Sequence, residues 1–238
     1  MLIKNYNLRM KSNKEILFKI DRSVVNGIET EFDGIPPNFC MAVIGKPGSG
    51  KTSLLKFLFK DERLLFKKFN KVYIISPSFQ EYKNCFLLPS ENFTGEVDFS
   101  WIYDKIQKDN KMATKEKKKN VVFIFDDVVT NLRSQKSKTE FASLIFNRRH
   151  LIENGTISII VTSQKYKTLP SEIRITLNVI LLFPIAEIEL DQIEQEHVTE
   201  YKNFKHAVST TFTGIDKFLF FRIDNSTYYN NFNKINTI

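Results

Sequence analysis

MAVIGKPGSGKTSLL, residues 41–55, is the most informative stretch of the 238-residue sequence. Four apolar residues lead into a glycine-rich segment that matches G-x-x-x-x-G-K-[ST], and an apolar helical pattern follows. Glycines let backbone N–H groups turn around phosphates at the start of a helix. We therefore expect a nucleoside triphosphate to bind here, with Lys51 contacting its β- and γ-phosphates and Thr52 as a ligand of Mg²⁺. The expected binding residues are Gly45, Lys46, Pro47, Gly48, Ser49, Gly50, Lys51, Thr52 and Ser53.

Two carboxylates follow a second apolar run, Val121 to Phe125. A buried strand of a parallel sheet delivers such groups beside the phosphate loop, at its carboxyl end. Asp126 is the expected partner of Mg²⁺ or its waters. Asp127 is the expected base that positions the attacking water, although a helix cap or an outer ligand of the metal is the alternative. Without a phosphate loop nearby, the same pattern would indicate only a strand and an Asp turn.

A third apolar run, Ile157 to Thr162, ends in Ser163 and Gln164. The Gln164 amide could hydrogen-bond the γ-phosphate or the attacking water, and so report hydrolysis to the next segment. A polar residue at a strand exit is ordinary, and only the predicted neighbourhood favours this role.

Short apolar runs that alternate with helical patterns predict an α/β fold with a parallel sheet covered on both faces. An extra strand between the phosphate loop and the acidic strand is typical of additional-strand ATPases, with sheet order 5-1-4-3-2. Helices are expected at 52–69 (one or two), 98–107 and 139–151, and a solvated acidic helix after Pro184. A strand and turn are expected in 218–232, with 15–20 as an accessory partner strand and 105–120 as a mobile lysine loop. The five strands are predicted at Met41–Ile44, Val72–Ser76, Val121–Phe125, Ile157–Thr162 and Val179–Phe183.

Length and composition suit one domain, residues 1–238, with a core at about 36–184 and accessory segments at 1–30 and 185–238. The two cysteines and ordinary apolar content exclude a disulfide scaffold or a fibre and fit a reducing, intracellular setting. No apolar run reaches the roughly 18 to 20 residues that span a bilayer, so no membrane span is expected. Lys and Arg exceed Asp and Glu by 35 to 27, a net charge of +8 that makes a polyanionic partner plausible.

A family resemblance rests on six segments in consistent order over residues 36–184. They resemble the genome-packaging ATPases of large eukaryotic DNA viruses and their virophages, the poxvirus-type branch of the FtsK/HerA P-loop superfamily. The resemblance implies a ring, a hexamer or pentamer, that hydrolyses ATP with Mg²⁺ to drive double-stranded DNA into a preformed capsid. It also implies a capsid or portal partner and a location in the viral factory of the host cytoplasm and in the virion. The segments are NFCMAVIGKPGSGKTSLL, KVYIISPSF, VVFIFDDV, FNRRHL, ISIIVTSQKYKTLPSEIR and NVILLF.

The resemblance also implies roles for single residues. Asp127 falls on the water-activating acid, where many relatives have Glu, so its shorter side chain has less reach. Arg148 and Arg149 match a basic pair that would act across the subunit boundary, with Arg174 as the reserve candidate; a surface salt bridge is the alternative for each. Lys51 and Thr52 fall on the phosphate-loop pair, Asp126 on the metal carboxylate and Gln164 on the sensor.

Lysines of the 105–120 segment, with Lys165 and Lys167, could hold the DNA backbone, or could simply keep the protein in solution. Two other functions remain open. A nucleoside or small-molecule kinase would carry an arginine-rich lid, whereas the lid-like segment here, residues 105–120, contains lysines and no arginine. A nucleotide-switched DNA-binding or assembly factor would bind ATP without moving DNA, and would tolerate loss of Asp127 but not of Lys51.

Overall fold

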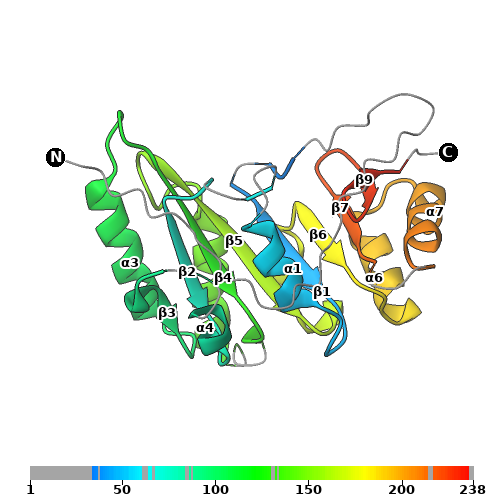
Figure 1. Cartoon of the computed structure of the whole chain (residues 1–238), viewed down its shortest axis with the longest axis horizontal. Helices are drawn as coiled ribbons and strands as arrows, with labels where there is room; N and C mark the ends of the chain where they lie inside the picture. Colours follow the sequence, from blue (N-terminus) through cyan, green and yellow to red (C-terminus); the bar gives the residue numbers. More distant parts are fainter. Residues whose placement is uncertain are drawn as a thin grey trace.

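One mixed sheet organises the protein (Figure 1). The computed structural model describes residues 34–36, 38–60, 64–65, 68–83, 86, 88–129, 132, 134–213 and 217–235. Within these ranges nine strands lie in the order β3-β2-β4-β5-β1-β6-β7-β8-β9. The strands are β1 (Cys40–Ile44), β2 (Lys71–Ile75), β3 (Phe93–Thr94), β4 (Lys119–Phe125), β5 (Gly155–Ser163), β6 (Val179–Leu182), β7 (Leu219–Arg222), β8 (Thr227–Asn230) and β9 (Asn233–Lys234).

The five central strands confirm the predicted topology. β6, β1, β5, β4 and β2 are parallel neighbours, which is the order 5-1-4-3-2 expected from the chain. The sheet extends further than predicted at both edges: β3 pairs parallel with β2, and β7, β8 and β9 continue beyond β6 in antiparallel pairing. In a parallel arrangement the carboxyl ends of the central strands meet at one edge of the sheet.

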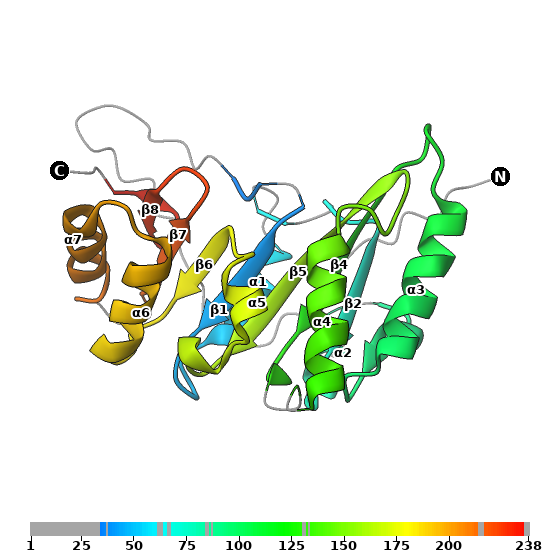
Figure 2. The ribbon, with the colours of Figure 1, turned by 180° about the vertical axis from the view of Figure 1, so that it is seen from behind.

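Side chains of the central strands alternate between two buried cores, as the pleat requires. On β1, Ala42 and Ile44 face one core, while Met41 and Val43 face the other. α1 (Lys51–Leu58) and Tyr82 of α2 (Phe79–Lys83) contribute to the Met41 core. The Ala42 core is covered by α3 (Phe99–Met112), α4 (Gln135–Asn147), α5 (Ser171–Arg174), α6 (Glu187–His197) and α7 (Tyr201–Thr211), seen from behind in Figure 2.

Polar side chains cap the first turns of α3 and α4. Asp98 accepts a hydrogen bond of 2.9 Å from the Ser100 N–H at the start of α3, and Ser134 accepts one from the Ser137 N–H at the start of α4. Of the one or two helices predicted at 52–69, α1 is the first and ends at Leu58, and the second half of that range lies partly outside the described residues. None of the described helices is long and apolar enough to cross a bilayer.

The expectation of a mobile lysine loop over 105–120 is wrong for most of that segment. α3 continues to Met112 and β4 begins at Lys119, which leaves only 113–118 as a connection. Lys105 is 7% exposed, and its Nζ lies 5.3 Å from the centre of the Trp101 ring and 5.9 Å from that of Tyr73. Lysine is a good helix former, so a lysine-rich stretch need not be a loop.

The C-terminal part completes the sheet edge. The predicted strand and turn are confirmed as the β7–β8 hairpin, whose turn includes Ser226 at φ 51°. The expected partner strand at 15–20 lies outside the described residues; β7 pairs with β6 and β8. The acidic segment forms α6 as predicted, but it is not simply solvated, because Ile193 is buried and Glu189 and Glu194 are nearly so.

Candidate functional site

The glycine-rich loop joins the carboxyl end of β1 to the start of α1 (Figure 1). The N–H of Gly45 donates a 3.1 Å hydrogen bond to the carbonyl of Ser163, which fixes the loop to the end of β5. A Cβ on Gly45 would lie 2.5 Å from Ser49 Oγ and 2.8 Å from Phe183 Cβ, so only glycine fits. Gly48 and Gly50 have φ of 73° and 95°, a backbone conformation that favours glycine.

Lys51 folds back over the loop. Its Nζ donates to the carbonyl of Gly45 at 2.7 Å and to that of Lys46 at 3.1 Å. Burial lowers the pKa of Lys51, while the charges of Asp126 and Asp127 act to raise it. The ammonium group is therefore within electrostatic range of both predicted acids.

The loop fits a phosphate group. The Ser49 hydroxyl is buried and has no hydrogen-bond partner among the described residues. A buried hydroxyl without a partner is costly in a folded protein. A phosphate oxygen would satisfy it, together with the backbone N–H groups at the start of α1 and the Lys51 ammonium.

Asp126 is buried, 3% exposed, at the carboxyl end of β4, and both of its oxygens accept hydrogen bonds. The Thr162 hydroxyl donates to Oδ1 at 2.7 Å, and the Tyr82 hydroxyl donates to Oδ2 at 2.7 Å. The Tyr82 hydroxyl also shares a side-chain hydrogen bond with Thr52, so one phenol oxygen contacts both Thr52 and Asp126. Burial, followed by the charge of Asp126, raises the pKa of Tyr82, so its hydroxyl stays protonated.

The donor set suits Mg²⁺. A hydroxyl and a carboxylate are oxygen ligands, and Mg²⁺ is usually held by one or two protein groups with phosphates and waters completing its shell. Thr52 and Asp126 are therefore the residues that would hold the ion or its waters.

Asp127 is exposed beside the buried Asp126 and has a φ of 56°. Its N–H donates a 3.0 Å hydrogen bond to Thr162 Oγ1, which holds this uncommon conformation. Strained backbone of this kind is often found at functional sites. Ser134 caps α4, so Asp127 does not act as the cap of that helix.

Gln164 directly follows β5 and is exposed. The residue before it, Ser163, accepts the hydrogen bond from Gly45 and donates its own hydroxyl to the Lys165 carbonyl at 2.8 Å. The predicted sensor is therefore one residue away from the contact that fixes the phosphate loop.

The two predicted arginines of the basic pair lie at the opposite edge of the sheet. Arg148 ends α4, is 5% exposed, and donates to the Ile145 carbonyl at 2.8 Å. Its charge interacts with Cys40 at the start of β1, whereas the phosphate loop follows the end of that strand, about 16 Å away. Arg149 is exposed next to it.

Arg174, the reserve candidate, is engaged elsewhere. Its Nε lies 3.1 Å from Oε2 of Glu196, and its guanidinium lies 5.6 Å from the centre of the Tyr166 ring. Of these three arginines, Arg149 is the exposed one, whereas Arg148 and Arg174 are held by the contacts described above.

Two residues of the site, Tyr82 and Thr162, were not predicted. The sequence did contain a signal for Thr162, since a hydroxyl residue near the end of an apolar strand lies at the edge of the sheet where ligands bind. Tyr82 had none, because its segment is separated from the motifs in sequence and reaches them only through tertiary packing.

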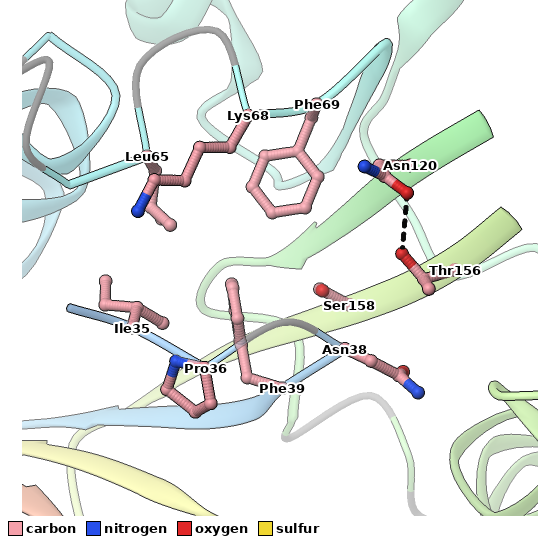
Figure 3. A pocket seen from close by; sticks show the side chains of 10 residues that line it. All are labelled: Ile35, Pro36, Asn38, Phe39, Leu65, Lys68, Phe69, Asn120, Thr156 and Ser158. Carbon is pink, nitrogen blue, oxygen red and sulfur yellow. Dashed lines mark hydrogen bonds between the residues drawn. The ribbon is translucent and has the colours of Figure 1, made fainter. Parts of the chain in front are cut away.

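A hollow of about 340 Å³ lies away from this site, at the amino ends of the strands (Figure 3). Asn120 of β4 and Thr156 of β5 face it and share a 3.0 Å hydrogen bond, and Phe39 and Lys68 border it on other sides. None of the predicted site residues lines it.

The fold and the site define a P-loop ATPase of the additional-strand type. The Poxvirus A32 protein family matches residues 35–235, so the chain belongs to that family and the predicted resemblance is confirmed. No curated protein matches the chain.

Solved structures agree on the fold. Genome packaging NTPase B204 from Sulfolobus turreted icosahedral virus 2, in complex with AMPPCP, is 16% identical with a TM-score of 0.60, over 86% of this chain and 100% of that one. The DNA-packaging ATPase B204 from Sulfolobus turreted icosahedral virus is 16% identical with a TM-score of 0.58, over 86% and 100%. The pCW3 conjugation coupling protein TcpA with ATPγS is 15% identical with a TM-score of 0.51, over 84% and 60%.

Proposed function

We propose that this protein is an Mg²⁺-dependent ATPase motor that moves double-stranded viral DNA into a capsid. The observation that carries the proposal is the convergence of Lys51, Thr52 and Asp126 at the carboxyl edge of the sheet, beside a loop that only glycines can form. Membership of the Poxvirus A32 family supports the biological role.

The described residues divide the chemistry between them. Lys51 and the loop N–H groups would bind the β- and γ-phosphates, and Thr52 and Asp126 would hold Mg²⁺, which neutralises charge on the transferring phosphoryl group. Asp127 is exposed beside Asp126 and would orient and deprotonate the attacking water. Gln164 would contact the γ-phosphate or that water from the end of β5.

The described surface has a basic region for a polyanion at the amino edge of the sheet. The Asn110 side chain accepts a 2.9 Å hydrogen bond from the Glu153 N–H, which brings the end of α3 beside the turn that follows Arg149. Exposed lysines bind DNA phosphates without reading the bases, as a DNA motor requires. The exposed lysines of this region are Lys108, Lys111, Lys115, Lys117 and Lys118.

The remaining parts of the proposal concern assembly. A ring of six or five copies would bring Arg149 of one subunit toward the nucleotide of the next, because within its own chain this arginine lies at the far edge from the phosphate loop. Docking on a capsid or portal, in the host cytoplasm where capsids form, would complete the motor. The named functions of B204, as a packaging ATPase, support this assignment.

The test is ATP turnover by the full chain with and without long duplex DNA, at several salt concentrations. We expect DNA to stimulate turnover, and salt to weaken the stimulation. Changing Lys115, Lys117 and Lys118 together to Gln should weaken DNA stimulation and leave DNA-independent turnover intact. Turnover that ignores DNA under every condition in which mass measurement detects oligomers would contradict the motor.

A further inference from the structure

A buried tyrosine outside the sequence motifs lies at the centre of the nucleotide site. Tyr82 of α2 is 0% exposed, and its hydroxyl donates 2.7 Å to Asp126 Oδ2 while sharing a hydrogen bond with Thr52. These are the two groups that would hold Mg²⁺. One phenol oxygen therefore links the hydroxyl from α1 with the carboxylate from β4.

The rest of the network fixes the carboxylate from its other side. Thr162 donates to Oδ1 of Asp126, and the Ser76 hydroxyl lies 3.5 Å from Oδ2. Each carboxylate oxygen offers two lone pairs. Oδ2 accepts from Tyr82 and, at 3.5 Å, from Ser76, whereas Oδ1 accepts from Thr162 alone among the described residues and keeps a lone pair for a metal or its waters. The network therefore orients Asp126 without using up its acceptors.

Packing holds the tyrosine in place. The Tyr82 ring lies 6.0 Å from the ring of Phe86, which in turn lies 5.8 Å from Phe59, just after α1. Lys56 of α1 places its Nζ 5.9 Å from the Tyr82 ring centre. Moving the hydroxyl would disturb this core, so the phenol is a fixed donor rather than a mobile one.

We propose that Tyr82 is the positioning residue of the divalent-cation site, which it prepares by holding Thr52 and Asp126 at a fixed separation. The proposal rests on the proposed Mg²⁺-nucleotide site and adds to it a residue that acts through Thr52 and Asp126. Partners that orient metal ligands typically change metal affinity about 10- to 100-fold when they are removed.

A purely structural role for Tyr82 is the competing explanation, and the chain offers a matched control. Tyr73 of β2 is 3% exposed, and its hydroxyl donates 2.8 Å to the buried Asp109. Tyr73→Phe and Tyr82→Phe each remove one buried tyrosine–aspartate hydrogen bond, but only Tyr82→Phe removes it beside the phosphate loop.

The experiment titrates Mg²⁺ into the full chain with a fluorescent ATP analogue, and repeats the binding measurement in EDTA. Mn²⁺ paramagnetic resonance then counts bound metal directly. Tyr82→Phe should raise the half-saturating Mg²⁺ concentration about 10-fold or more. Its binding in EDTA should match that of the unchanged protein, and Tyr73→Phe should behave like the unchanged protein throughout.

Two results would overturn the role of Tyr82: a Mg²⁺ titration that overlays that of the unchanged protein, or equal weakening with and without metal. Failure of the unchanged protein to bind nucleotide more tightly with Mg²⁺ would instead remove the proposed function itself. If Tyr82→Phe does not fold, 3-fluorotyrosine at this position replaces it. Its fluorine resonance should move when Mg²⁺ joins the bound nucleotide, and an unmoved resonance would refute the proposal.

Discussion

Thr162 and Asp126 are joined by a 2.7 Å hydrogen bond from the Thr162 hydroxyl to Oδ1, between adjacent strands β5 and β4. The same hydroxyl accepts the N–H of Asp127 at 3.0 Å. A single threonine on the sensor strand therefore fixes both consecutive acids, one through its side chain and the other through its backbone.

Thr162→Val should impair both acids. The change removes one donor and one acceptor from a fully buried position, and we expect a loss of about 1–3 kcal/mol of unfolding free energy. ATP turnover should fall further than nucleotide binding, because Asp127 loses its backbone support. Chemical denaturation and steady-state kinetics measure the two effects. Thr162→Ser keeps the hydroxyl and should retain most of the unfolding free energy and most of the ATP turnover. Equal losses in Thr162→Val and Thr162→Ser would contradict the prediction.

Gly45→Ala should damage the phosphate loop. The new methyl would meet Ser49 Oγ at 2.5 Å and Phe183 Cβ at 2.8 Å, so the loop must shift at a cost of about 1–3 kcal/mol. Calorimetric binding of an ATP analogue should weaken with it. Gly95→Ala is the control, since its methyl would lie 3.5 Å from the Phe79 ring, an ordinary contact. Undiminished nucleotide binding by Gly45→Ala would show that the loop tolerates the shift.

Asp127→Asn should separate binding from hydrolysis. Asn tolerates the positive φ at this position, so the backbone should be kept. Loss of a general base lowers turnover by a factor of about 10² to 10⁴. The affinity for ATP should stay within about twofold of that of the unchanged protein. Asp104→Asn, at an exposed position of α3, is the control. If Asp127→Asn hydrolyses ATP normally, Asp127 is not the base. If Asp127→Asn hydrolyses no ATP but keeps the function that Lys51→Ala loses, the protein acts as a nucleotide switch instead of a motor.

Arg148→Ala should affect mainly stability, and Arg149→Ala mainly ATP turnover. Arg148 is buried and caps the end of α4, so its loss should lower the unfolding free energy by about 1–3 kcal/mol. Arg149 is exposed, and its loss should change stability by less than about 0.5 kcal/mol while reducing turnover. Mixing Arg149→Ala with Lys51→Ala subunits should restore part of the activity, because each supplies what the other lacks. Absence of recovery in mixed oligomers would count against an arginine acting across subunits.

His197 should make stability depend on pH. Burial lowers its pKa, Glu196 acts to raise it, and Arg174 lowers it; its Nε2 lies 2.7 Å from the Tyr166 hydroxyl. The folded state therefore binds this proton less readily than the unfolded chain. The neutral form's contribution is complete above about pH 6.5 and is lost as pH falls below that value. Denaturation between pH 8 and 5 should show a smaller decline for His197→Gln, and an unchanged decline for His150→Gln, at an exposed site.

The sequence predicted what local patterns determine. The glycine motif after Met41–Ile44 and the acids after Val121–Phe125 specify the phosphate loop and the acidic strand within single short segments. The order of the predicted strands along the chain then predicted the order of the five central strands in the sheet. By contrast, β3 and β9 are two residues long, too short to produce a periodic signal.

Residues that depend on distant packing could not be predicted. Tyr82 reaches Asp126 across 44 positions of sequence, and the pattern around it resembles any short helix. The end of α3 was misplaced because lysines were interpreted as a solvated loop, although Lys105 is buried with its ammonium group over the rings of Trp101 and Tyr73. Arg148 was predicted to act across the subunit boundary or to form a surface salt bridge, and its burial at the end of α4 is visible only in the folded chain.

The burial of Lys105 and Arg148 changes what ionic-strength experiments will measure. Each exposed cation that neutralises a DNA phosphate releases condensed counterions, and the slope of log affinity against log salt is about −0.9 per contact. Two of the 35 Lys and Arg side chains, Lys105 and Arg148, are enclosed in the interior and release none. The salt slope will therefore report the cations at the surface, and the formal charge of the chain is a poor guide to its value.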